Sequence, residues 1–293
     1  MRFFSVFLFR ALNFLMRTSP RLFSSRSYFW SKRAHQTKLF LRPRACFFES
    51  RANDNHVLMT LRNVFRQKVL DGEVQDLLEI GYGPGLDMVW FADVNEVKSV
   101  NGLDITPEFH KIVSNKAKKL TKMNPLLGGP EDSTKHLEPN SIDTIYVFFG
   151  ALNTCAELEK AVFDMSKVLK PGGRIVATFV NKWYAFDILW NIVMLRPKKA
   201  MSRLRKVWGG YSPTRFLASR CYSARQIHGI FKKELIKKHR SGYCITHPAW
   251  YRHHWAPLQS FRSKFFYKLD AFLQWTPFWN LGEYSLYIYE KPE

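Results

Sequence analysis

Three glycines at alternate positions, Gly81, Gly83 and Gly85, follow a short apolar run and precede residues typical of a helix. The pattern predicts a strand, a tight turn and the start of a helix. Glycine suits such a turn because a Cβ would block both the sharp bend and the approach of a ligand to the backbone. The helix N-terminus beyond it offers unpaired N–H groups and positive dipole character to an anionic group. We therefore expect a nucleotide-like ligand at this turn.

An acidic residue, Asp104, ends the second predicted strand. It follows the glycines by about 20 residues, the distance at which the end of a second strand reaches ribose hydroxyls. The turn alone does not choose among ligands, since sites for NAD, FAD and S-adenosylmethionine all use a glycine-rich loop.

The loop sequence Glu-Ile-Gly-Tyr-Gly-Pro-Gly, residues 79–85, has glycines two apart throughout and resembles motif I of the class I S-adenosylmethionine-dependent methyltransferases. Residues 141–153 look like the fourth strand and active-site turn of that family, and residues 168–176 like the turn into its fifth strand. The resemblance covers roughly residues 75–181 and is to a methyltransferase type 11-like domain. It implies an α/β, Rossmann-like fold: a seven-stranded, mostly parallel sheet with helices on both faces and a helical insertion before the last two strands.

The resemblance also implies S-adenosylmethionine as the cofactor. It assigns Glu79 to the methionine end of the cofactor, Asp104 to the ribose, and Glu131 or Asp132 to the border of the adenine. The cofactor-binding candidates are Glu79, Gly81, Tyr82, Gly83, Gly85, Asp104, Ile105, Glu131, Asp132, Phe149 and Gly150. The third strand is the part that matches the family pattern least well, because residues 125–132 contain two prolines and two glycines, which make a poor strand.

A sulfonium makes its methyl group electrophilic without help from the protein, so catalysis consists mainly of holding a nucleophilic O, N or C in line with it. A general base is optional. The polar candidates are His247, Tyr184 and Asn153, and none of them stands out. Asn153 either caps the following helix or contacts the active site.

The remaining elements are expected to surround this site. One or two helices within residues 46–75 pack beside it, and Pro107 opens a helix that reaches Leu120. Residues 142–149 form a fourth strand whose nearly continuous apolar run is typical of a strand buried on both faces. Residues 235–245 form a sixth strand, and residues 284–289 a final one, which in the resembled family runs antiparallel at the sheet edge.

Two insertions, residues 182–233 and 246–280, are expected on the substrate side of a methyltransferase domain spanning residues 46–293. Residues 183–195 are aromatic-rich and are followed by a basic stretch. They form either a lid over an apolar substrate, docking at a membrane surface through that basic flank, or an ordinary helix buried against the sheet edge. Residues 247–255 contain paired histidines without Cys, Asp or Glu, so we expect pocket lining or a packing loop and no metal site.

The N-terminal segment, residues 1–45, is set apart by its charge. Residues 1–48 hold ten Lys and Arg and no acidic residue, within a formal net charge of +21. Basic and apolar residues fall on opposite helical faces at its start, as in a mitochondrial transit peptide. Retention as an amphipathic membrane anchor and a basic disordered tail are the alternatives. No apolar run reaches the ~20 residues of a spanning helix. We expect a mitochondrial protein of the matrix or the inner-membrane surface.

Three classes of function compete. The first is methyl transfer to a small or lipid-like molecule, which the aromatic insertion favours. The second is methylation of RNA or protein, which the basic charge outside the N-terminal segment favours, although no RNA-binding motif is present. The third is a methyltransferase-like assembly factor without catalysis, against which the intact glycine loop and Asp104 argue.

Overall fold

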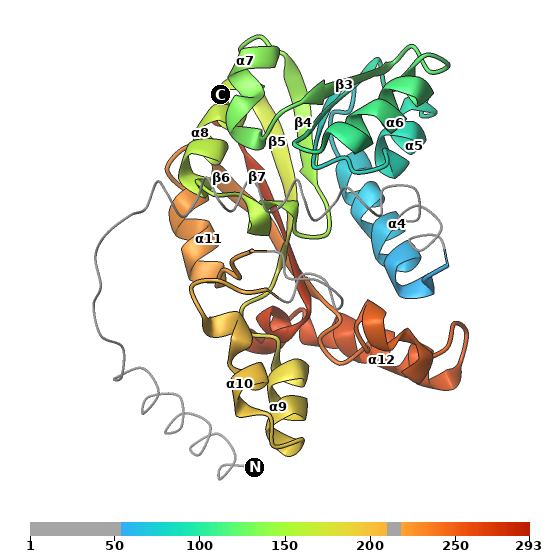
Figure 1. Cartoon of the computed structure of the whole chain (residues 1–293), viewed down its shortest axis with the longest axis vertical. Coiled ribbons are helices and arrows are strands. Elements are labelled where there is room, and N and C mark those ends of the chain that lie inside the picture. The colour runs from blue at the N-terminus through green and yellow to red at the C-terminus, as the bar shows by residue number, and fades with distance from the viewer. Residues whose placement is uncertain (1–53, 210–217) are drawn as a thin grey trace. The chain divides into compact units, whose positions relative to one another are not determined.

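A computed structural model of the chain describes residues 54–209 and 218–293, and the predicted segment 1–45 lies outside them. Seven strands form one sheet in the order β3-β2-β1-β4-β5-β7-β6 (Figure 1). Strands β1 to β5 are parallel, and β7 is antiparallel to both of its neighbours. The strands are β1 (Asp76–Ile80), β2 (Ser99–Asp104), β3 (Met123–Leu127), β4 (Ile142–Val147), β5 (Leu169–Val180), β6 (Ile236–Tyr243) and β7 (Tyr284–Glu290). The predicted fold class is confirmed.

Helices cover both faces of the sheet. The helices of the described residues are α4 (His56–Leu70), α5 (Leu86–Ala92), α6 (Pro107–Ala117), α7 (Ser133–His136), α8 (Leu158–Val168), α9 (Ala185–Val193), α10 (Pro197–Ala200), α11 (Ala224–Phe231) and α12 (Phe261–Leu273). Short 3₁₀ turns are η2 (Pro130–Asp132), η3 (Ala151–Thr154), η4 (Ser202–Leu204), η5 (Trp250–Trp255) and η6 (Pro277–Leu281). Among the described residues, no helix combines the length and apolar character needed to cross a membrane.

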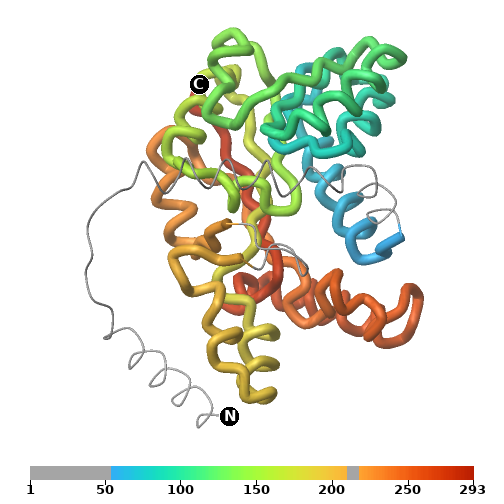
Figure 2. Tube along the Cα trace, in the orientation of Figure 1, coloured from blue at the N-terminus to red at the C-terminus, as the bar shows by residue number. Residues whose placement is uncertain are grey.

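The core lies on the two sides of the sheet. Helices α4, α5 and α6 pack apolar side chains such as Phe65 and Phe91 on one face, against Leu77 and Tyr146 of the strands. Helices α8 and α11 pack Met165 and Phe231 on the other face. Figure 2 shows α4 between the α5–α6 region and the segment that leads into α12, where η5 contacts it.

Three boundaries differ from the sequence-based expectations. The final strand β7 does not lie at the sheet edge, because β6 pairs outside it. The third strand begins earlier than residues 125–132 and contains Pro125, which an edge strand tolerates because its missing N–H would face solvent. The fourth strand ends at Val147, since Phe149 and Gly150 have positive φ angles of 53° and 78° and turn the chain away from the sheet.

Candidate active site

The glycine loop joins β1 to α5 as expected. Gly81, Gly83 and Gly85 have φ angles of 75°, 54° and 77°, a region that side chains other than glycine rarely adopt. A Cβ on Gly81 would lie 2.7 Å from that of Ala151, so η3 packs directly against the loop. A Cβ on Gly83 would meet no described atom within 4 Å. The loop is thus tightly packed on one side and open on the other, where a ligand can approach its backbone.

The carboxylate of Asp104 fastens this loop to the end of β2. Its Oδ2 accepts the Gly83 N–H at 2.9 Å, and its Oδ1 accepts the Thr106 N–H at 2.8 Å. Burial raises the pKa of Asp104, and these two hydrogen bonds oppose the rise. Each carboxylate oxygen has a second lone pair, which suits a ribose hydroxyl. The sequence did not predict the hydrogen bond from Gly83. Through it, Asp104, the residue predicted to bind the ribose, also holds the glycine loop in place.

Glu79 lies at the end of β1 and is buried. Its Oε2 accepts a hydrogen bond of 3.0 Å from the Tyr146 hydroxyl on β4. Burial, followed by the charge of Asp87, raises the pKa of Glu79 well above its usual range. A buried carboxylate in this state gains from a cation placed beside it. The residues present therefore fit the ammonium group at the methionine end of S-adenosylmethionine.

A buried charge cluster beside Glu79 was not predicted. Asp87, in the first turn of α5, binds the guanidinium groups of Arg62 and Arg66 on α4. The Arg62 guanidinium also lies 4.8 Å from the centre of the Phe149 ring, and that of Arg66 lies 4.7 Å from the Trp90 ring. The feature of the sequence that could have indicated the cluster is the pair Arg62 and Arg66, four residues apart beside the apolar face of a predicted helix. This cluster fixes α4 over the cofactor side of the sheet.

The acidic turn after β3 has two different carboxylates. Asp132 accepts the Gly129 N–H at 3.0 Å and pairs with Lys135 at 2.6 Å, and these contacts lower its pKa against the opposing effect of burial. Burial raises the pKa of Glu131, whose Oε2 lies 3.9 Å from the Cys155 Sγ that follows η3. Asp132 is thus engaged within its own turn, while Glu131 points toward the loop that borders the glycine turn.

Of two other predicted cofactor residues, Tyr82 supports the loop through its contacts. Tyr82 is buried, and its hydroxyl lies 3.2 Å from both His110 Nδ1 and the Leu126 carbonyl oxygen. Ile105 is half-buried directly after β2. Tyr82 thereby connects the glycine turn to α6 and β3.

The turn after β4 carries Phe149, Gly150 and Asn153. The Phe149 ring lies between Phe65 of α4 and Tyr284 of β7, with centroid distances of 5.5 and 5.9 Å. The buried Asn153 side chain donates to the carbonyl oxygens of Val180 and Arg220 and accepts the Val180 N–H. Asn153 therefore joins η3 to the end of β5, and Glu157 takes the N-cap position of α8.

The other two catalytic candidates are held by their own neighbours. His247 is buried and stacked on Tyr267, with Nδ1 2.9 Å from the Pro248 carbonyl oxygen and Nε2 3.2 Å from Ser263 Oγ. Burial lowers the pKa of His247. Tyr184 is buried just before α9, with Arg203 stacked on its ring, and its hydroxyl has no hydrogen-bond partner among the described residues. The structure does not assemble these candidates into one catalytic group.

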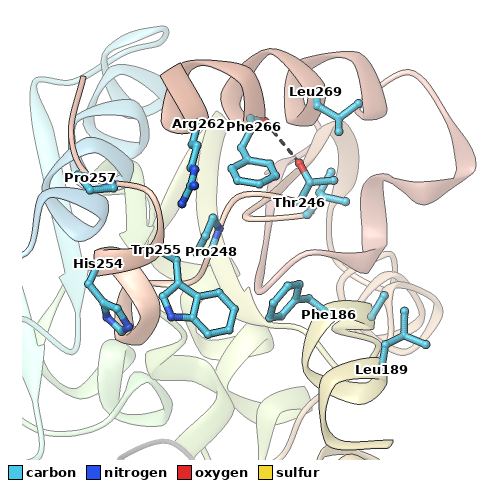
Figure 3. Close-up of a pocket in the computed structure, with 12 residues that line it drawn as sticks. Phe186, Leu189, Thr246, Pro248, His254, Trp255, Pro257, Arg262, Phe266 and Leu269 are labelled. Atoms are coloured by element: carbon cyan, nitrogen blue, oxygen red, sulfur yellow. Dashed lines mark hydrogen bonds between the residues drawn. The ribbon is translucent and has the colours of Figure 1, made fainter. Parts of the chain in front are cut away.

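An apolar cavity of about 870 Å³ lies among the two insertions. In Figure 3 Phe186 and Trp255 lie on one side of it and Phe266 and Leu269 on the side of α12. None of the glycine-loop residues lines the cavity. Its lining comes from α9, the segment after β6, η5 and α12: Ala185, Phe186, Leu189, Ile245, Thr246, Pro248, His254, Trp255, Pro257, Arg262, Phe266 and Leu269. In the part of the chain that the structure describes, no group of three or more His, Cys, Asp or Glu could hold a metal ion.

Comparisons with known proteins agree with this geometry. Residues 78–177 match the family described as "Methyltransferase domain". A search of curated proteins gives no match.

Similar solved structures share the fold at low identity. N-methyltransferase NodS from Bradyrhizobium japonicum, in complex with S-adenosyl-L-homocysteine, is 15% identical with a TM-score of 0.54, covering 88% of this chain and 100% of its own. An S-adenosylmethionine-dependent methyltransferase from Mesorhizobium loti is 14% identical with a TM-score of 0.52, covering 78% and 96%. Geranyl diphosphate C-methyltransferase from Streptomyces coelicolor is 15% identical with a TM-score of 0.52, covering 80% of each chain.

The family match spans β1 to β5, the elements that carry the glycine loop, Asp104 and the turn after β4. The solved structures extend the same fold over the insertions and the last strands. Residues 78–177 therefore form a methyltransferase domain of the class I S-adenosylmethionine-dependent kind, and S-adenosylmethionine is the cofactor of this domain.

Proposed function

We propose that this methyltransferase acts on a small, apolar, lipid-like acceptor. The observation that carries the proposal is the cavity of about 870 Å³, which both substrate-side insertions line largely with aromatic and aliphatic side chains. Ligand pockets are predominantly apolar with a few polar groups that orient the ligand. Arg262 and His254 supply such groups here and suit an acceptor with one polar or anionic end.

The chain's own residues have separable tasks in this reaction. Glu79 and the glycine loop hold the methionine end of the cofactor, and Asp104 holds the ribose while it fixes the loop. The cofactor supplies an electrophilic methyl group, so the remaining task is to place the nucleophile of the acceptor in line and to exclude water. The aromatic insertions are suited to that task.

Full-length protein incubated with radiolabelled S-adenosylmethionine and a mitochondrial extract tests the proposal. Label is expected in the lipid or small-molecule fraction. It should be lost with Asp104→Ala and kept with the matched control Asp93→Ala, whose residue is exposed directly after α5. Phe186→Ala is expected to reduce labelling while leaving cofactor affinity unchanged.

Other outcomes identify the alternatives. Enzyme-dependent label in the RNA or protein fraction would replace the lipid-like acceptor with a macromolecule, as the basic charge of the chain favours. Absence of label in every fraction, together with measurable cofactor binding, would favour an assembly factor.

We also propose a mitochondrial location with contact at a membrane surface. The support is the acid-free, arginine-rich composition of residues 1–48. Residues 1–50 fused to a fluorescent protein should direct it to mitochondria, and a diffuse cytosolic signal would contradict the proposal.

A further inference from the structure

Helix α12 buries polar side chains and exposes phenylalanines, although Phe266 and Leu269 on its inner side line the cavity. It buries Ser263 and Asp270, with exposed fractions of 2% and 7%, and it exposes Phe261, Phe265 and Phe272, with exposed fractions of 84%, 52% and 66%. A helix on the surface of a soluble domain turns its apolar stripe toward the core. The outward stripe of α12 is therefore suited to an apolar environment outside the domain.

The buried polar side chains of α12 have hydrogen-bond partners on its inner side. Asp270 accepts hydrogen bonds from the backbone N–H groups of Ile245, Thr246 and His247 and from the Thr246 hydroxyl. Ser263 lies within hydrogen-bond distance of His247 Nε2. The inward face of α12 thus holds the segment after β6 through polar contacts, and the phenylalanines are left on the outside.

Exposed apolar residues continue beyond α12. Trp275, just after it, is 92% exposed, and Leu258 before the helix and Phe278 after it are also exposed. Across the cavity, the end of α9 exposes a second group: Leu189, Ile192, Val193, Met194 and Leu195. Figure 1 places α9 and α12 at the same end of the described domain, away from α7 and β3. We term these two groups of exposed residues together the α9–α12 surface.

The charges on the α9–α12 surface are all of one sign. Lys264 and Lys268 are exposed and share the stripe of Phe261 and Phe265 at helical spacing, within a sector roughly 100° wide. Arg196, Lys198 and Lys199 are exposed directly after α9. The acids of these insertions in the described residues, Asp187 and Asp270, face inward, where Asp187 pairs with Arg252. The surface is complementary to an apolar, anionic environment.

This charge pattern distinguishes among the partners that could bind the α9–α12 surface. A two-fold contact with a second copy would oppose lysines to lysines without an exposed acid to offset them. Residues 1–48 of the same chain contain no acid and would be repelled in the same way. Mixed aromatic and basic residues on an exposed helix face match the interface of an anionic bilayer. We propose that the α9–α12 surface docks on a membrane containing anionic lipids, with Phe261, Phe265, Phe272 and Trp275 inserted at the headgroup level.

The proposed function includes contact with a membrane surface, and this inference rests on it by naming the residues that make that contact. Docking is measured without cofactor or acceptor, so failure of methyl transfer and failure of docking are separate results. Purified full-length protein is sedimented with vesicles of phosphatidylcholine, alone or with about one-fifth phosphatidylglycerol. Circular dichroism of each variant checks that it folds.

The double variant Phe261→Asp/Phe272→Asp is expected to lower binding to anionic vesicles about tenfold or more. The matched control Phe163→Asp/Ile236→Asp adds the same charge at exposed apolar residues on α8 and β6 and should bind like the wild type. Lys264→Glu/Lys268→Glu should weaken binding to anionic vesicles only, as should high salt. Because residues 1–53 are identical in all variants, these differences report on α12.

A second readout follows insertion directly. Vesicles with brominated acyl chains should quench tryptophan fluorescence, and Trp275→Phe should remove part of that quenching. Equal binding by the wild type and the Phe261→Asp/Phe272→Asp variant, or no vesicle binding at all, would overturn the proposal. A dimer in light scattering that this variant dissociates, without vesicle binding, would assign the surface to a second copy instead.

Discussion

At the residue scale, the cofactor side of the site depends on carboxylates that the fold removes from water. Glu79 receives one hydrogen bond, from Tyr146, and lies close enough to Asp87 for that charge to raise its pKa further. Asp104 instead receives two backbone N–H groups that oppose the effect of burial. The two acids thus differ in how strongly they need a counter-charge, and Glu79 needs it more.

Cofactor affinity is expected to fall as the pH drops through the raised pKa of Glu79, because only the ionised carboxylate attracts an ammonium group. The fall should begin at a higher pH than an ordinary glutamate, with its pKa of 4.5, would allow. Tyr146→Phe removes a hydrogen bond that lowers this pKa and should move the midpoint higher still. Calorimetric titration of S-adenosylmethionine between about pH 5 and 8 measures the effect. The Glu79→Gln variant should bind weakly without this pH dependence, and a wild type with flat affinity would contradict the assignment.

Replacing Asp104 by Asn is expected to weaken both the loop and the ligand site, because an amide N–H would then face the N–H of Gly83 or Thr106. We expect losses of about 1–3 kcal/mol in unfolding free energy and in cofactor binding. Urea unfolding and calorimetry measure the two quantities. Glu138 is exposed and lies away from the site, so Glu138→Gln serves as the control that removes the same charge. This control should change neither the unfolding free energy nor the cofactor affinity. Normal cofactor affinity in the Asp104→Asn variant would exclude the ribose role.

At the element scale, α4 is held over the glycine turn by charge as well as by its apolar face. Val57, Leu61, Phe65 and Val69 pack on the core, while Arg62 and Arg66 reach Asp87 at the start of α5. Arg66 also donates to the Leu86 carbonyl oxygen at 3.2 Å. Three side chains thus set the angle between α4 and the helix that begins at the cofactor loop.

Loss of the Asp87 charge should therefore destabilise the protein more than loss of a surface charge. Asp87→Asn leaves two buried guanidinium groups without their carboxylate, which costs about 3–5 kcal/mol for a buried pair. The control Asp71→Asn removes the exposed pair with Lys68 at the end of the same helix, worth about 0–1 kcal/mol. Urea unfolding compares the two variants. Equal losses would show that α4 is held by its apolar contacts alone.

The sequence predicts those features that depend on local patterns. The glycine turn, Asp104 at the end of β2 and Pro107 at the start of α6 all follow from spacing or from residues with strong backbone preferences. The roles of Asn153 and His247 could not be predicted, because their partners lie far along the chain, as Arg220 does for Asn153. Helix α12 was hidden for a further reason: its phenylalanines have the composition of a core, but the fold turns them outward.

At the scale of the whole molecule, one buried ion pair connects the first insertion to the sheet. Arg203, in η4, pairs with Glu283 at 2.7 Å beside β7 and donates to the Asn181 carbonyl oxygen after β5. Asp187 of α9 pairs in turn with Arg252 of η5 at 3.2 Å. The two insertions that line the cavity are therefore attached to the sheet and to each other by charges.

Arg203→Met should destabilise the protein by about 3–5 kcal/mol near neutral pH, because it leaves Glu283 buried without its cation. Burial raises the pKa of Glu283 and Arg203 lowers it, so the variant raises that pKa further. A carboxyl group whose pKa is higher in the folded than in the unfolded state costs stability in full above its folded pKa, and this cost is lost as the pH falls to its unfolded pKa. The variant should therefore recover stability on acidification. Urea unfolding at about pH 5 and 7.5 tests this, with Arg203→Met/Glu283→Gln as the variant expected to lack the recovery.

Both outer strands of the sheet are unsuited to extension by another chain. Strand β3 carries Pro125, which lacks a backbone N–H, and β6 exposes Lys237, Lys238, His239 and Arg240 along its length. Proline and dense positive charge are the usual means by which proteins prevent edge-to-edge pairing and fibril growth. Aggregation through the sheet is thus opposed at both ends, including at the high local concentration that the proposed docking on a membrane would produce.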